Sequence, residues 1–205
     1  MTRKATVRPV DAAGLVLLRD GKHSLEVLLG RRHARAGFLP DIYVFPGGRV
    51  EPADGAGPAL GLAPAVAAEL SRATRKPAEA FVRAALRETE EETGLTLAGE
   101  ALASIDFVCR AITPTYSRRR YNTRFLMADG AFAQGQLGGD GELEDLAWRP
   151  VAGLEGLAIV DVTAFVLREA VARRLGKRPP GAVPAVRFSY VGDTARVFGA
   201  VLSRG

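Results

Sequence analysis

The amino-acid sequence predicts an α/β fold, and three features support this prediction. Apolar, strand-like runs at residues 10–19 and 25–30 are joined by an Asp-Gly dipeptide, which is typical of a β-hairpin. Residues 79–94 have the pattern of one long helix that ends at a glycine. Further strand-like runs at residues 105–114 and 123–128 follow this helix. Strands on both sides of a helix, in a chain of 205 residues, predict a single α/β domain spanning residues 1–205.

Composition and charge narrow the class of protein. The chain is 47% hydrophobic and 25% charged, as in ordinary globular proteins, and no apolar run is long enough to span a membrane. The single cysteine, Cys109, excludes an internal disulfide, and no signal-peptide segment follows the basic N-terminus, so we expect a cytoplasmic location. A net charge of +5 favours anionic partners, either phosphorylated metabolites or nucleic acid, although solubility alone explains it equally well.

The first hairpin leads into a glycine turn. Arg31 and Arg32 follow the second strand directly and are candidate phosphate contacts, with a solvated strand edge as the alternative. A strand over residues 38–48 is expected to run into Gly47 and Gly48. Glycine permits backbone angles that other residues avoid, so a carbonyl at this turn could face a metal ion beside the helix. The alternative is an ordinary Pro-Gly turn.

The helix predicted at residues 79–94 carries an acidic cluster. At about 100° per residue, Glu88, Glu91 and Glu92 lie within an arc of about 100° on the side opposite the apolar positions. Such like-charged neighbours repel each other in a simple solvated helix. A divalent cation would relieve the repulsion, and ligation by oxygen atoms alone favours Mg²⁺ or Mn²⁺ over zinc.

The spacing of residues in this helix resembles a known motif. The pattern E-x7-R-E-T-x-E-E-x-G-L resembles the second half of the box that defines the Nudix hydrolase family. Its fixed positions here are Glu79, Arg87, Glu88, Glu91, Glu92 and Gly94. Thr89 stands where the motif has an apolar residue, and Ala73 stands where it has a glycine.

The missing glycine is found upstream. The sequence P-G-G-x-x-E at residues 46–51 resembles the start of the same box, with the next expected acid at Asp54. An insertion of roughly 25 residues, over about 53–77, is therefore expected to interrupt the box. A short helix is expected from residue 63 to residue 74, and the insertion would cap or border the site.

The second half of the chain narrows the resemblance. The chain has the sequence Arg-x-Ile-Thr-Pro from Arg110, followed by Asn-Thr-Arg-Phe around Arg124. This pattern is similar to that of a Nudix branch that includes acyl-CoA diphosphatases. Both arginines are therefore candidate substrate contacts. Between them, the arginine-rich tip at residues 118–120, with its neighbouring tyrosines, suits a nucleotide or RNA; a solvated tip is the alternative.

The acidic stretch before Trp148 resembles another recurrent Nudix feature. Glu142, or failing it Glu144, would supply a further metal ligand or the general base; a solvated loop is the alternative. An extension from about residue 160 is expected to contain a helix at 162–175, with Asp161 as N-cap, and strands around 186–190 and 195–202. This extension would close the sheet or form a homodimer contact.

The resemblance implies an α/β/α sandwich with a central mixed β-sheet. It also implies Mg²⁺- or Mn²⁺-dependent hydrolysis of a nucleoside diphosphate linked to another moiety, first of all a coenzyme A or acyl-CoA type diphosphate. ADP-ribose or a dinucleotide is the alternative substrate, and a non-catalytic nucleotide-binding regulator is the alternative function. Cap hydrolysis or RNA binding is less expected, and no membrane partner is expected.

The resemblance also implies roles for individual residues. The metal ligands would be Glu88, Glu91 and Glu92 together with a carbonyl of Gly47 or Gly48. Glu88 or Glu142 would act as the base. Arg87 would pair with a neighbouring glutamate and hold its rotamer.

Overall fold

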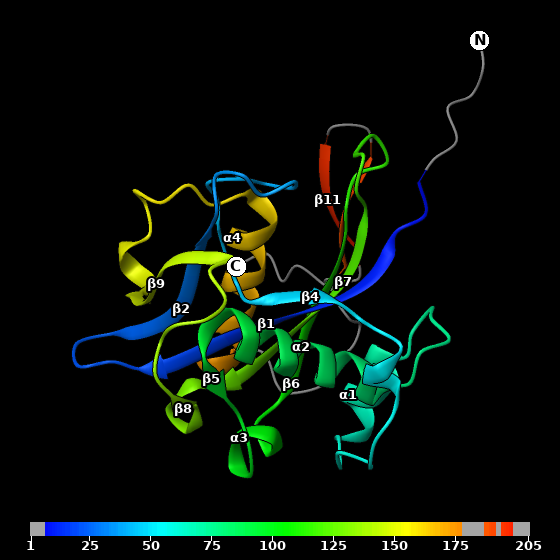
Figure 1. Cartoon of the computed structure of the whole chain (residues 1–205), viewed down its shortest axis with the longest axis horizontal. Coiled ribbons are helices and arrows are strands. Elements are labelled where there is room, and N and C mark those ends of the chain that lie inside the picture. The colour runs from blue at the N-terminus through cyan, green and yellow to red at the C-terminus, as the bar shows by residue number, and fades with distance from the viewer. Residues whose placement is uncertain (1–6, 178–186, 192–193, 199–205) are drawn as a thin grey trace.

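The computed structural model describes residues 7–177, 187–191 and 194–198. In this part of the chain, nine strands form one sheet in the order β11-β10-β6-β7-β1-β2-β3, with β4 paired to β1 and β9 paired to β2 (Figure 1). The pairs β1–β7 and β6–β10 are parallel and the others are antiparallel, so the sheet is mixed, as expected. The strands are β1 Val10–Asp20, β2 Leu25–Arg32, β3 Tyr43–Val44, β4 Gly47–Arg49, β6 Asp106–Ile112, β7 Tyr121–Asp129, β9 Leu143–Pro150, β10 Arg187–Val191 and β11 Thr194–Phe198, with a small second sheet of β5 Leu95–Thr96 and β8 Gln134–Gly135.

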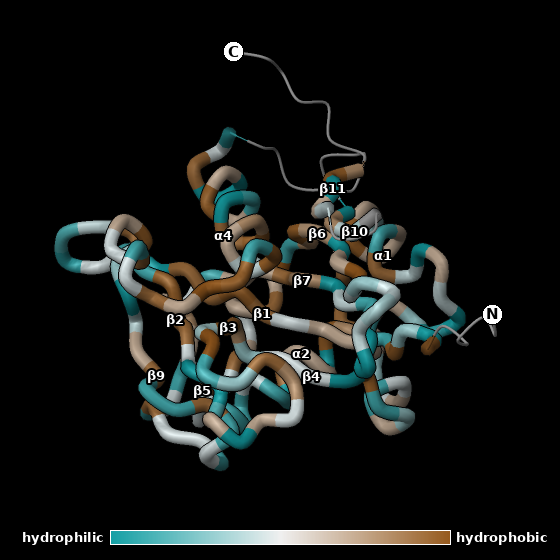
Figure 2. The backbone as a smooth tube through the Cα atoms, turned by 90° about the horizontal axis from the view of Figure 1, so that it is seen from above, coloured by the Kyte–Doolittle hydropathy of each residue, from teal (hydrophilic) through white to brown (hydrophobic). Residues whose placement is uncertain are grey.

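Helices cover both faces of the sheet. Leu15 and Leu17 of β1 pack in one apolar cluster with α1 and α2, whereas the alternate residues Val16 and Leu18 pack in a second cluster with α4. Figure 2 shows α2 and α4 on opposite sides of the strands. Because both faces of β1 are buried, its sequence is continuously apolar, and the expected α/β/α layering is confirmed. The helices are α1 Pro64–Leu70, α2 Ala78–Thr93, α3 Glu100–Ala103 and α4 Asp161–Arg174, with 3-10 turns η1 Ala53–Gly55, η2 Gly130–Phe132 and η3 Val151–Gly153.

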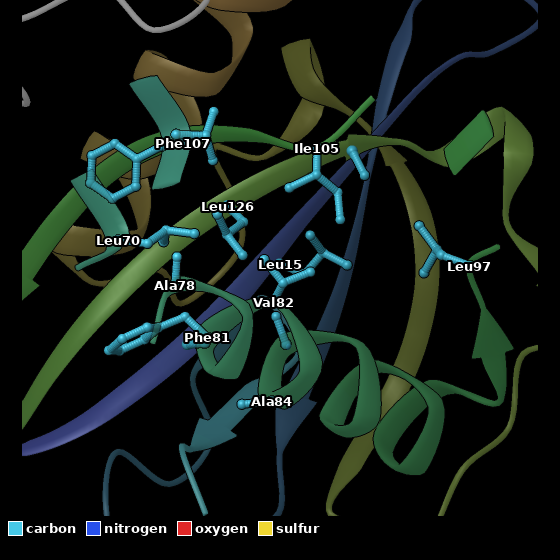
Figure 3. Close-up of a cluster of buried hydrophobic side chains, with 14 of the residues drawn as sticks. Leu15, Leu70, Ala78, Phe81, Val82, Ala84, Leu97, Ile105, Phe107 and Leu126 are labelled. Carbon is cyan, nitrogen blue, oxygen red and sulfur yellow. The ribbon is translucent and has the colours of Figure 1, made fainter. Parts of the chain in front are cut away.

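The long helix α2 matches its predicted bounds within one residue. Its apolar face, which includes Phe81 and Val82, points towards β1, β7 and α1 (Figure 3). The two threonines on the packed side are fully buried, yet each hydroxyl donates a hydrogen bond to the carbonyl four residues earlier: Thr89 to Ala85 and Thr93 to Thr89. A polar residue is therefore tolerated at the position where the motif has an apolar one.

The segment between the two halves of the box folds against the sheet. It contains η1 and α1, and α1 is shorter than the helix expected within residues 63–74. The strand expected over residues 38–48 is replaced by the short strands β3 and β4. Its first part cannot be extended, because Leu39 and Asp41 have φ angles of 49° and 56°.

The C-terminal extension widens the sheet at the β6 edge. Strand β10 pairs with β6, and β11 pairs with β10, so the expected pairing of the two terminal strands is present in the described residues. Residues 186 and 199–202 of that prediction lie outside the described residues. Asp161 is the first residue of α4 and not its N-cap, because the extended residue before the helix is Val160. The Asp161 carboxylate accepts hydrogen bonds from the backbone N–H of Val162 and from the hydroxyl of Tyr190.

Candidate active site

A pocket of about 610 Å³ opens where the glycine turn meets α2. Its lining includes Glu88 of α2, Gly47 and Gly48 of β4, Arg32 at the end of β2, and Glu142 just before β9. It also includes seven aromatic side chains. The aromatic lining consists of Phe38, Phe45, Tyr116, Tyr121, Phe125, Phe188 and Tyr190.

Glu92 ties the helix to the glycine turn. Its carboxylate is 2% exposed and accepts a 2.8 Å hydrogen bond from the backbone N–H of Gly47. Burial raises the pKa of Glu92 to about 8, and the nearby carboxylates of Glu142 and Glu88 add to this, while the Gly47 hydrogen bond acts in the opposite direction. The site therefore contains a buried carboxylate that a cation would stabilise in its charged form.

Glu88 lies directly against the second glycine of the turn. A Cβ atom placed on Gly48 would be 2.3 Å from the carboxyl carbon of Glu88, so any larger residue would displace this carboxylate from the turn. Gly47 is equally confined, since a Cβ there would come within 2.4 Å of the carbonyl oxygen of Ala13 in β1. The antiparallel pairing of β4 with β1 holds both glycines at this place beside α2 (Figure 1).

Arg87 organises the acidic residues around it. Its guanidinium donates to Glu88 at 2.7 Å, to Glu91 at 3.3 Å and to the buried carboxylate of Asp54 at 3.1 Å, and also to the carbonyl of Arg49. Hydrogen bonding to Asp54 is the largest influence that raises the pKa of Arg87. Arg87 thus connects α2 to the first half of the interrupted box, and it pairs with a neighbouring glutamate.

Glu91 is less engaged with the turn than its two neighbours. Its side chain is 50% exposed and pairs with Arg87, and it does not line the pocket. Glu88 and Glu92 meet the glycines, so the structure brings together two of the three helix carboxylates and leaves Glu91 at the rim.

The loop before β9 places Glu142 at the pocket. The backbone N–H groups of Gly138 and Asp140 donate to the carbonyls of Thr93 and Glu91 at the end of α2. Close packing requires a glycine at position 139, where a Cβ would be 2.3 Å from the carbonyl oxygen of Glu92. Glu142 therefore lines the pocket, whereas Glu144 pairs with Arg31 outside it.

The two arginines at the end of β2 behave differently. Arg32 lines the pocket, donates to Glu142 at 2.9 Å, and has a buried Nε that bonds no atom of the described chain. Arg31 is held by ion pairs with Asp41 and Glu144 and does not line the pocket. Arg32 thus remains a candidate substrate contact and Arg31 does not reach this pocket.

The expectation that Arg110 and Arg124 contact substrate in this pocket is not supported by their positions. They pair with each other across β6 and β7, and residues in register point to the same face of a sheet. Arg124 is fully buried, stacks 4.1 Å above the ring of Phe81 in α2, and donates to Asp11 and to the carbonyls at the end of α1. From these two strands the pocket is lined instead by residues such as Ala111 and Thr123, which alternate with the arginines.

The arginine-rich tip does not act as one unit. Arg119 lines the pocket, but Arg120 is 9% exposed and donates to the carbonyls of Val7 and Thr113. Most of the aromatic lining was not predicted from the sequence. The alternation of side chains along a strand places Tyr121, Thr123 and Phe125 on one face of the sheet. This alternation groups the three residues, but it does not indicate which face of the sheet holds the site.

The donor atoms of the site suit a divalent cation. Carboxylate and carbonyl oxygens are the donors that Mg²⁺ and Mn²⁺ prefer, and no basic side chain of the described residues donates a hydrogen bond to the buried carboxylate of Glu92. Within the described residues, however, no three acidic, histidine or cysteine side chains converge closely enough to enclose an ion. The donors fit chemically, while Arg87 holds Glu88 and Glu91 in this arrangement.

Comparisons with known proteins agree with this architecture. Residues 8–164 match the family profile described as the NUDIX domain. A NUDIX hydrolase from Alicyclobacillus acidocaldarius is 25% identical and superposes with a TM-score of 0.63, over 88% of this chain and all of the other. The comparison with curated protein sequences gave no match. The chain therefore belongs to the Nudix family and is a hydrolase of the pyrophosphohydrolase type.

Two more distant structures share the fold. The NUDIX domain of Shewanella oneidensis NrtR, solved with ADP-ribose, is 16% identical with a TM-score of 0.54, over 82% of this chain and 90% of the other. An Ap4A hydrolase from C. elegans, solved as a binary complex, is 19% identical with a TM-score of 0.53, over 82% of this chain and 98% of the other. At these identities the likeness concerns the fold.

Proposed function

We propose that this protein hydrolyses a nucleoside diphosphate linked to a second moiety, with a coenzyme A or acyl-CoA type diphosphate as the leading substrate. The observation that carries this proposal is that one pocket is lined both by carboxylates with the glycine turn and by seven aromatic side chains. Such a pocket suits a ligand with an anionic diphosphate at one end and a flat base at the other. Its volume of about 610 Å³ is within the usual range for cofactor sites.

In this proposal the chain's own residues position the diphosphate. Glu88 and Glu92, with a carbonyl of the glycine turn, would hold Mg²⁺ or Mn²⁺, and Glu91 would join them from the rim. When bound, the cation neutralises charge on phosphoryl oxygens and makes water a better nucleophile. Arg32, with its unbonded Nε, would donate to a phosphate oxygen. Arg87 would orient Glu88 and Glu91 and hold the Asp54 turn against α2.

A general base is proposed from the carboxylates that line the pocket. Burial raises the pKa of Glu88, partly offset by its hydrogen bond from Arg87, and a raised pKa brings a carboxylate closer to the range that suits proton transfer. Glu142 is the alternative base, since it also lines the pocket. Glu144 is less favoured because its carboxylate pairs with Arg31 and does not line the pocket.

ADP-ribose and dinucleotides are the second candidate substrates. They are favoured by the structural neighbours solved with ADP-ribose and described as an Ap4A hydrolase. The coenzyme A assignment rests on the sequence motif around Arg110 and Arg124. Neither arginine lines the pocket, but Thr113, Pro114, Thr123 and Phe125 of the same motif do.

A substrate panel tests the proposal. The protein is incubated with Mg²⁺ or Mn²⁺ and coenzyme A, acetyl-CoA, ADP-ribose, NADH or diadenosine polyphosphates, and mononucleotide products are measured. We expect turnover that Glu88→Gln and Glu92→Gln each reduce by at least about 10²-fold. Glu90→Gln, on the exposed side of the same helix, is the matched control and should retain activity. Tight binding of a panel member without turnover by the parent protein would favour a non-catalytic regulator instead.

Location and assembly are also proposals. No described helix has the length and apolar character to cross a membrane. We propose a cytoplasmic location, in line with the single buried cysteine. The terminal strands β10 and β11 extend the sheet beyond β6. Light scattering on the purified protein would detect a homodimer directly.

A further inference from the structure

A second pocket lies on the α1/α2 face of the sheet. Its volume is about 760 Å³. It is formed by the start of β1, by the insertion just after α1, and by the end of the β6–β7 pair. Its charged and polar lining includes Arg8, Asp11, Arg75, Lys76, Arg110 and Asn122.

Strand register separates this second pocket from the pocket of about 610 Å³ that is proposed to bind the diphosphate, which is called the diphosphate pocket below. Ile112, Asn122 and Asp11 are neighbours across β6, β7 and β1, and they point to the same face as Arg124, which contacts α2. The diphosphate pocket is lined by the alternate residues Ala111 and Thr123, and Ile112 is the one residue that the two linings share. The cationic side chains of the second pocket therefore do not line the diphosphate pocket.

The cations of the second pocket lack acidic partners. Among the described residues, no carboxylate forms an ion pair with Arg8, Arg75, Lys76 or Arg110. The one acid in the lining, Asp11, is already used, because it accepts from Arg124 at 2.8 Å and also from Asn122 and Thr74. The charge of Asp11 also acts on Arg110, so it offsets part of the positive charge of this lining. The described chain offers the four cations no other carboxylate in the lining.

Further cations crowd the same face. Arg187 of β10 is in register with Arg110 of β6, so both side chains leave the sheet on the same side. Burial, and after it the charges of Arg124 and Arg187, lower the pKa of Arg110. Like charges held this close raise the free energy of the protein unless an anion binds among them.

We propose that this second pocket is a binding site for a small, multiply phosphorylated anion, distinct from the diphosphate site. Arginine suits phosphate because its planar guanidinium donates two parallel hydrogen bonds, and Lys76 would add a mobile positive charge. The cations line a concave pocket, which suits a compact ligand better than an extended nucleic-acid strand. Because Arg75 and Lys76 come from the insertion, the insertion would serve as part of this site and not as a lid over the diphosphate pocket.

Calorimetric titration with tripolyphosphate tests the proposal. The full-length protein is titrated in EDTA, so that binding through a divalent cation at the diphosphate site is excluded. We expect saturable binding that Arg75→Glu and Arg110→Gln each weaken by at least about tenfold. Arg75 is exposed, so its substitution leaves the core intact.

Two controls locate the binding site. Lys22→Glu makes the same charge change at the turn that begins at the opposite end of β1, and it should leave the affinity within about twofold. Arg49→Gln removes a cation that lines the diphosphate pocket and should also have little effect. The proposal would be overturned if Arg49→Gln abolished the binding of tripolyphosphate and Arg75→Glu left it intact. A second result would also overturn the proposal. In that result the protein fails to bind tripolyphosphate but binds a single-stranded RNA, and Arg75→Glu abolishes the binding of the RNA.

Discussion

At the scale of single residues, Glu92 and Gly48 show how the site depends on close contact. Glu92 is buried, and among the described residues its carboxylate accepts one hydrogen bond, from the backbone N–H of Gly47. Gly48 leaves the space in which the Glu88 carboxylate lies. Both contacts join α2 to β4, and both lead to a measurable expectation.

Glu92 should make the metal-free protein less stable as the pH rises. Its pKa is about 8 in the folded chain against an ordinary value of 4.5, so between these values the folded state binds more protons than the unfolded state. The free energy of unfolding therefore falls from about pH 5 to pH 8, by a few kcal/mol at about 1.4 kcal/mol per pKa unit.

Urea unfolding in EDTA at several pH values measures this effect. Glu92→Gln stays neutral and can still accept the hydrogen bond from Gly47, so its stability should change much less over the same pH range. Glu90→Gln should follow the parent protein. Equal pH dependence in the parent and in Glu92→Gln would show that Glu92 does not titrate as expected.

Gly48→Ala should impair catalysis more than folding. The added methyl group would be 2.3 Å from the Glu88 carboxyl carbon, so the side chain of Glu88 must move away from the turn. A displacement of about 1 Å at a reacting centre costs up to about 10²-fold in rate, and we expect kcat to fall by at least tenfold. Gly55→Ala is the matched control, because nothing lies within 4 Å of a Cβ at that glycine. Unchanged kcat in Gly48→Ala would argue against Glu88 as a participant.

At the scale of elements, Arg124 joins the insertion to the sheet. The guanidinium donates to the carbonyls of Leu70 and Arg72 at the end of α1, and it pairs with Asp11 of β1. These carbonyls have no partner further along the helix, so Arg124 acts as a cap that reaches from β7.

Arg124→Met should therefore destabilise the protein and loosen the insertion. The substitution leaves Asp11 without its cation and α1 without its cap, and loss of one partner of a buried ion pair costs about 3–5 kcal/mol. Urea unfolding would measure the loss, and limited proteolysis should show faster cleavage within residues 55–77. Arg168→Met, on the exposed side of α4, is the control. A raised KM with unchanged stability would restore the earlier expectation that Arg124 contacts substrate.

At the scale of the whole molecule, positive charge gathers at two pockets. The chain has a net charge of +5. Arg32, Arg49 and Arg119 line the diphosphate pocket, and the second pocket is lined by four other cations. Such a field attracts anionic substrates from solution, and salt screens it.

Salt should consequently slow capture of the substrate more than its conversion. We expect kcat/KM to fall several-fold when the ionic strength rises from about 50 to about 300 mM, while kcat changes little. Initial rates with the best substrate of the panel, at constant free Mg²⁺, would measure both. A fall in kcat alone would instead indicate that salt acts on the chemical step.

The sequence by itself determined the parts of this protein that depend on local pattern. The period of α2, its end at Gly94 and the strand-like runs of β1, β2, β6 and β7 follow from residue spacing and turn chemistry. The close approach of Glu88 and Glu92 to the glycine turn followed from a resemblance, since the insertion separates these residues in the chain. All of these features are either local or belong to one motif whose two halves each have a fixed spacing.

Only the tertiary structure decided which side chains share a pocket. The register between β6 and β7 places Arg110 and Arg124 on one face and Thr123 on the other, and a shift of one residue would reverse this. The docking of the loop before β9 on the end of α2 likewise separates Glu142 from Glu144. Strand register and loop docking depend on contacts between residues far apart in the chain, so the local sequence pattern does not specify them.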